Sequence, residues 1–146
     1  MTTTKLLLAS IDEAYDVRSW HGTNLRGALR GVTREQAAWR AADDRHNIWE
    51  LMVHAAYWKY DIRRRLTGEK GRSFALEGSL AEWRADLALL QREHERLRQA
   101  VAAFPEARWT RKAPGKPFHF DGLVRGVAAH DLYHAGQIQL LKRLQQ

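Results

Sequence analysis

Apolar residues recur every three or four positions through most of the chain, a spacing that predicts amphipathic α-helices. Four long stretches show it: residues 4–29, 48–66, 80–104 and 121–146. A capping-box sequence at 33–36 predicts a short helix to about Arg40. The pattern therefore predicts an all-α, single-domain four-helix bundle over residues 1–146. It has a short extra helix between the first two long helices and a long loop before the last.

Polar residues and glycines mark the expected ends of these helices. Gly27 and Gly31 are predicted to end the first helix, and Asn47 to cap the second. The caps of the third and fourth helices are predicted to be Ser79 and Asp121. The loop 106–120, with its prolines and glycine, is long enough to cross an end of the bundle.

The apolar stripe of the last predicted helix contains two histidines. Its members are Leu123, Val127, His130, His134, Ile138 and Leu141, with Gln137 beside them. His130 and His134 are one helical turn apart, so their rings are expected on the same face. Imidazoles in a core stripe must be hydrogen-bonded or bind a ligand, since burying them otherwise destabilises the fold. Structural, hydrogen-bonded core histidines remain the alternative explanation of this pair.

Metal sites in helical bundles are built from side chains of facing helices, so a third ligand is expected on another helix. His54 is the predicted third ligand. Glu50 and Asp61 lie on the same helix and are predicted to orient its imidazole. Three imidazoles with open positions predict a site for one divalent transition metal.

Composition excludes several other chemistries. The chain has no cysteine, which rules out disulfides, thiolate zinc sites and a cysteine nucleophile. No apolar run approaches the ~20 residues of a membrane span, and the apolar start is too short for a signal-peptide core. We therefore expect no membrane association and a cytoplasmic location.

The net charge of +7 permits binding to nucleic acid or to anionic small molecules. Arginines are spread over all segments, which favours a solvated basic surface and makes nucleic acid an unlikely partner. Low-molecular-weight thiols carry carboxylates, and Arg18, Lys112 and Lys116 are candidates to bind them. His21 and His94, on the predicted inner stripes of the first and third helices, are candidate proton donors or extra ligands.

Tryptophans offer a second route to nucleic-acid binding, through stacking on bases. Helical spacing instead predicts that Trp58 and Trp83 are core residues. Trp109 lies in the basic loop 108–116 and is predicted to be exposed, where it would serve as a lid over the metal.

Residues 47–58 and 126–137 carry a family resemblance. The first reads N-I-W-E-L-M-V-H-A-A-Y-W, and the second contains H-x-x-x-H followed by Gly-Gln. Together they resemble the DinB-like (YfiT-type) superfamily of metal-binding four-helix bundles, which is unrelated to the DNA polymerase of similar name. The matching residues are Trp49, His54, His130, His134, Gly136 and Gln137, and the short helix with Trp39 fits the same pattern.

The resemblance implies that the three histidines bind a divalent metal, which in the family is zinc, nickel, iron or manganese. Relatives include bacillithiol and mycothiol transferases, a mycothiol-dependent maleylpyruvate isomerase and proposed hydrolases, and homodimers are common among them. The expected function is metal-dependent thiol (S-)transfer or hydrolysis of a small molecule. The alternatives are a basic nucleic-acid-binding module with structural histidines and a non-catalytic metal-binding bundle. The basic loop 108–116 matches no characterised relative.

Overall fold

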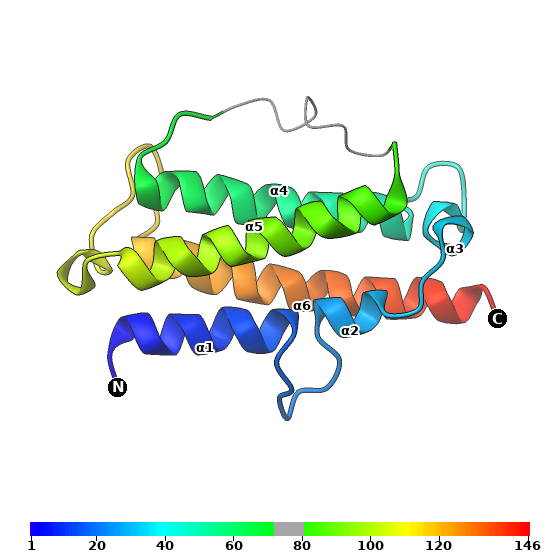
Figure 1. Cartoon of the computed structure of the whole chain (residues 1–146), viewed down its shortest axis with the longest axis horizontal. Helices are drawn as coiled ribbons and strands as arrows, with labels where there is room; N and C mark the ends of the chain where they lie inside the picture. The colour runs from blue at the N-terminus through cyan, green and yellow to red at the C-terminus, as the bar shows by residue number, and fades with distance from the viewer. Residues whose placement is uncertain (72–80) are drawn as a thin grey trace.

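The computed structural model describes residues 1–71 and 81–146. Figure 1 shows the long helices side by side, with α2 following α1 along the length of α6. The all-α bundle predicted from the sequence is confirmed. The long helices are α1 (Thr3–Tyr15), α4 (Ile48–Thr67), α5 (Trp83–Ala103) and α6 (Phe120–Leu144); the short ones are α2 (Leu25–Leu29), α3 (Arg34–Ala38) and a 3₁₀ turn, η2 (Glu106–Arg108).

The prediction of one continuous helix over 4–29 is wrong. Tyr15 ends α1, and a loop over residues 16–24 leads into α2. Gly22 has a φ of 102°, a left-handed conformation that interrupts a helix and favours glycine. Asn24 then restarts the helix, because its side chain accepts a hydrogen bond from the Gly27 backbone N–H at 2.9 Å.

The predicted start of α4 is confirmed in detail. The Asn47 side chain caps the helix by accepting a hydrogen bond from the Glu50 backbone N–H at 2.8 Å. The capping box of α3, formed by Thr33 and Gln36, is also present. Gly68 ends α4 with a φ of 79°, again left-handed.

The starts of α5 and α6 differ from the sequence prediction. Glu82 caps α5 by accepting hydrogen bonds from two backbone N–H groups. The predicted cap, Ser79, lies outside the described residues, as do Leu80 and most of the predicted loop 68–78. The cap of α6 lies two residues earlier than predicted, with His119 at the cap position and Asp121 in the first turn. An acidic residue there still favours the helix through its dipole.

Apolar side chains gather into two clusters along the bundle. One lies among α2, α3 and the adjoining parts of α4, α5 and α6, and includes Ala56, Leu90 and Ala135. The other lies toward the start of α1 and of α6 and includes Leu97 and Ala128. Three buried polar residues lie between the two clusters along α4, α5 and α6: Lys59, His94 and Asp131. The core is therefore crossed by a layer of polar side chains.

The basic loop closes one end of the bundle. Trp109 is 1% exposed, packs against Phe104 and Phe120, and donates a hydrogen bond to the Thr4 hydroxyl at 2.9 Å. Glu106 accepts hydrogen bonds from the first backbone N–H groups of α1. The prediction of an exposed Trp109 acting as a lid is wrong, because its indole fills the apolar cluster at this end.

None of the helices described over residues 1–71 and 81–146 combines the length and the apolar character needed to cross a bilayer.

Candidate metal centre

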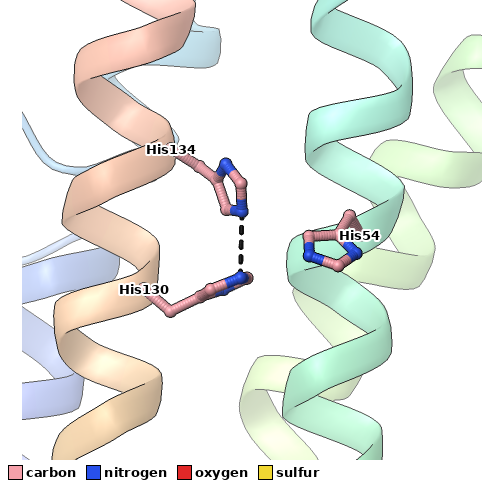
Figure 2. Close-up of side chains that lie close together, drawn as sticks. All are labelled: His54, His130 and His134. Atoms are coloured by element: carbon pink, nitrogen blue, oxygen red, sulfur yellow. Dashed lines mark hydrogen bonds between the residues drawn. The ribbon is translucent and has the colours of Figure 1, made fainter. Parts of the chain in front are cut away.

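The three predicted ligands come together between α4 and α6. Figure 2 shows the imidazole of His54 facing those of His130 and His134 from the opposite helix. The His54 ring centroid lies 5.0 Å from that of His130 and 5.2 Å from that of His134. One nitrogen from each ring lies within 4.8 Å of the others. Ligand nitrogens around one tetrahedral metal lie about 3.3 Å apart, so small side-chain rotations bring these three to a common point.

Burial changes steadily across the three rings. His134 is 5% exposed, His130 is half-buried, and His54 is exposed. The group therefore lies at the surface of the bundle, with two ligands anchored in α6 and the third open to solvent. A site of this kind can hold an ion from inside and still admit a small molecule from outside.

Gln137 fixes the tautomer of His134. The Nδ1 atom of His134 lies 2.6 Å from the Gln137 amide oxygen, which only accepts, so Nδ1 carries the proton. The Nε2 atom of His134 then carries the lone pair, which is directed at the other histidines. His130 donates to this lone pair from its own Nε2 at 2.9 Å, shown as the dashed line in Figure 2.

The other nitrogen of His130 has no hydrogen-bond partner in the described part of the chain, although its Nδ1 atom is buried. Metal binding through Nε2 of His130 requires that atom to lose its proton, and the buried Nδ1 is the nitrogen left to carry one. This nitrogen lacks a partner whether or not Nε2 binds an ion, so the case for a cation at His130 rests on the convergence of the three rings.

All three imidazoles favour the neutral form. Burial, together with the neighbouring His134, His54 and Lys59, lowers the pKa of His130 to about 4. Burial also lowers the pKa of His54 and that of His134, in the second case against the opposing hydrogen bond to Gln137. A neutral imidazole has a lone pair to offer, so at pH 7 these rings are ready to act as ligands.

Neither predicted carboxylate orients His54. Glu50 bonds to Arg40 and to Nδ1 of His46, and these contacts lower its pKa to about 2. Asp61 is buried and bonds to Arg64 and Arg65, one turn further along α4. Both acidic side chains pair with arginines instead: Glu50 pairs with Arg40, which precedes α4, and Asp61 pairs with two arginines of α4 itself.

The hydrogen-bond partner of His54 is Trp58, which the helical spacing predicted to be a core residue. The indole Nε1 of Trp58 donates a hydrogen bond to Nε2 of His54 at 3.2 Å. Trp58 is half-buried, one turn after His54 on α4, and its ring also lies 6.2 Å from that of His130. Its i,i+4 spacing from His54 is the signal that could have revealed the contact.

Arg18 and His21 do not lie on an inner helix stripe, because both fall in the 16–24 loop. Arg18 is exposed and lines an open cleft of about 1130 Å³ among α1, α2 and α5, whose lining includes none of the three histidines. Lys112 and Lys116 lie in the loop that closes the bundle end, and none of their hydrogen bonds in the described residues reaches the three histidines. Arg18 thus lines a different cleft, while a role of Lys112 and Lys116 at the histidine group stays a prediction.

His94 is buried as predicted but belongs to a different group. Its Nδ1 lies 3.2 Å from the Lys59 ammonium and its Nε2 3.3 Å from Asp12. Burial, Lys59 and Arg98 lower the pKa of His94 to about 2. Arg98 also bonds to Asp12 at 2.6 Å, so the carboxylate is neutralised by arginine and does not protonate the ring.

The ligand atoms of Asp12, Asp16 and His94 lie within 4.8 Å of one another, as those of the three histidines do. Here, however, the cationic positions are already filled: Lys59 contacts His94, Arg98 contacts Asp12, and Arg26 lies 3.7 Å from Asp16. This second group is a hydrogen-bonded ion network, and the three histidines are the better candidate for a metal.

A family model described as the DinB superfamily matches residues 18–138. The chain belongs to the DinB superfamily. The matched region contains His54, His130 and His134 and leaves out α1. Searches of curated proteins and of solved structures found no match. Membership in the DinB superfamily therefore supports the fold and the histidine arrangement, while the reaction has to be argued from the site.

Proposed function

We propose that His54, His130 and His134 bind one divalent transition metal. We further propose that this DinB superfamily member is an enzyme that uses the metal to catalyse a reaction of a small molecule. The observation that carries the proposal is the convergence of three neutral imidazoles from two facing helices. The donor set suits zinc, nickel or iron, which favour imidazole ligands, whereas manganese, the fourth metal that the family resemblance implies, favours oxygen ligands.

A metal with open coordination positions lowers the pKa of a water or thiol that it binds, and so supplies a nucleophile at neutral pH. The reaction class we propose is thiol transfer or hydrolysis, which share that requirement. The protein's own residues would hold the metal and orient its imidazole ligands. Gln137 keeps His134 in the ligating tautomer, and α4 presents His54 from the solvent side.

The neighbourhood of the site favours a substrate with apolar or aromatic character. Trp58 lies beside His54 and His130, and Tyr133, 66% exposed, lies 5.5 Å from the His134 ring. Aromatic side chains of this kind provide apolar contact area together with polar edges.

Element analysis of protein purified without a histidine tag tests the proposal. We expect about one equivalent of divalent metal in the wild-type protein, and its loss in His130→Ala because two imidazoles from separate helices bind far more weakly than three. His119→Ala is the matched control, since His119 is an exposed histidine at the start of α6, and we expect it to keep the metal.

Wild-type protein that holds no metal after incubation with zinc, nickel, iron or manganese would refute the proposal. Retention of metal by His130→Ala would refute the ligand assignment. For the enzymatic part, chelator-treated and remetallated protein is compared on thiol–electrophile pairs and on esters, and we expect turnover only in the remetallated sample.

A further inference from the structure

The hydrogen bond between Trp58 and His54 is incompatible with metal binding at His54. Trp58 donates from Nε1 to Nε2 of the imidazole at 3.2 Å, and the two rings meet edge to face. An indole N–H can only donate, so Nε2 of His54 must supply the lone pair. The proton of the neutral ring then lies on Nδ1.

A neutral imidazole has one N–H and one lone pair, and a metal needs the lone pair. If the ion binds Nε2, it takes the lone pair to which the indole N–H points. If it binds Nδ1, the proton moves to Nε2 and faces the indole N–H, so that two donors oppose each other. In both cases the bond from Trp58 is lost.

The other fixed histidine shows the opposite arrangement. Gln137 bonds to Nδ1 of His134 as an acceptor, which leaves Nε2 free and is compatible with a bound metal. Trp58 bonds to His54 as a donor, which occupies the lone pair. One neighbour thus prepares its histidine for the metal, while the other competes with the metal.

We propose that Trp58 competes with the metal for His54, so that metal loading releases the indole N–H from His54 and removal of the metal restores the bond. This inference rests on the proposed metal site. In the metal-free protein the bond holds the His54 ring near the other two histidines, although that ring is exposed. In the loaded protein the indole, half-buried beside His130, has a free donor next to the site.

The test is a zinc titration against a competing chelator, on tag-free wild-type protein, Trp58→Phe and Trp20→Phe. Phenylalanine keeps an aromatic ring but has no N–H. Because zinc then has no hydrogen bond to break, we expect Trp58→Phe to bind zinc about two- to tenfold more tightly, the range that one net hydrogen bond corresponds to. Trp20 is 96% exposed in the 16–24 loop, and its variant should bind as the wild type does.

A second measurement follows the hydrogen bond in the wild-type protein. The indole N–H resonance of Trp58 is assigned by its absence from the Trp58→Phe spectrum. At saturating zinc we expect its proton to move upfield and to exchange faster with solvent, because it has lost its acceptor. A resonance that stays downfield and protected in the zinc-loaded protein would overturn the inference.

Failure of this inference is distinguishable from failure of the metal site. If the wild-type protein binds none of zinc, nickel, iron and manganese, the proposed function itself fails and this inference falls with it. If zinc binds and Trp58→Phe binds it equally or more weakly, then Trp58 does not compete and only the inference falls. Thermal melting of the metal-free variants checks that Trp58→Phe is folded, and the resonance measurement decides the question without the variant.

Discussion

The bundle holds two groups of polar side chains that contain histidine, one between α4 and α6 and one that also includes α5, and their partners differ in charge. In the histidine group at the α4–α6 surface, each imidazole has neutral neighbours, namely other imidazoles, Gln137 and Trp58. In the buried layer, His94 lies against the ammonium of Lys59, which also pairs with Asp131. The first group is made of neutral side chains, whereas the second contains the ammonium of Lys59.

The difference shows that a lowered histidine pKa occurs both at a candidate ligand and at a structural residue. Both His130 and His94 have a pKa well below the ordinary value. For His130 the cause is chiefly burial, with smaller contributions from His134, His54 and Lys59, and its hydrogen bond goes to another imidazole. For His94 burial is joined by nearby cations, and its Nδ1 lone pair accepts a hydrogen bond from Lys59. Only the partners of a histidine distinguish a candidate ligand from a structural residue.

The largest effect is expected from breaking the buried layer. Lys59→Met leaves the Asp131 carboxylate buried without its partner, and we expect a loss of about 3–5 kcal/mol in the free energy of unfolding, measured with urea. The double variant Lys59→Met/Asp131→Leu removes both charges and should recover most of that loss and keep its metal. A loss below about 1 kcal/mol in Lys59→Met would contradict the importance given to this pair.

A smaller effect is expected at the histidine group. Gln137→Leu removes the acceptor that holds His134 in its ligating tautomer, and we expect zinc affinity to fall about 10- to 100-fold, as measured by chelator competition. Gln139→Leu is the matched control, because Gln139 bonds to Thr23 away from the site. Equal affinities in the two variants would show that Gln137 plays no part in metal binding.

The smallest expected effect is a pH dependence from His94. Its pKa is about 2 in the folded protein against an ordinary value of 6.5, so below pH 6.5 the unfolded chain takes up a proton that the folded protein does not. Stability from this group is therefore complete above pH 6.5 and falls as the pH drops, by at most about 1.4 kcal/mol per pH unit.

Urea unfolding of wild type and His94→Gln between pH 7.5 and 5 isolates this term, because other titrating groups are common to both proteins. Glutamine can still accept from Lys59 but does not titrate. We expect the variant to lose less stability on acidification; parallel curves for the two proteins would rule out the assigned role of His94.

Local signals predicted much of the fold and the positions of the candidate ligands. Asn47 predicted the start of α4 because capping depends only on neighbouring residues. The four-residue spacing placed His130 and His134 together, with Gln137 beside them, because one helix determines all three positions. The break after Tyr15 was missed although Gly22 and Asn24 carry its signals, since the apolar spacing continues across them.

Features set by distant partners could not be predicted in the same way. Lys59 and Asp131 are 72 residues apart, and nothing beside either residue indicates that a lysine and an aspartate are buried against each other. Trp109 lies in a basic, proline-containing loop, yet it is buried because Phe104, Phe120 and Thr4 surround it. Burial of these residues is a property of the assembled bundle.

The buried pair of Lys59 and Asp131 also determines how α4 and α6 are aligned along their axes. A slide of one helix past the other by a single turn, about 5.4 Å, would carry each charge away from its partner and into an apolar cluster. Burying an ion alone costs several kcal/mol, so misaligned arrangements are strongly disfavoured. Because His54 lies five residues before Lys59, and His130 directly precedes Asp131, the alignment that satisfies the two charges is also the one that brings the three imidazoles together.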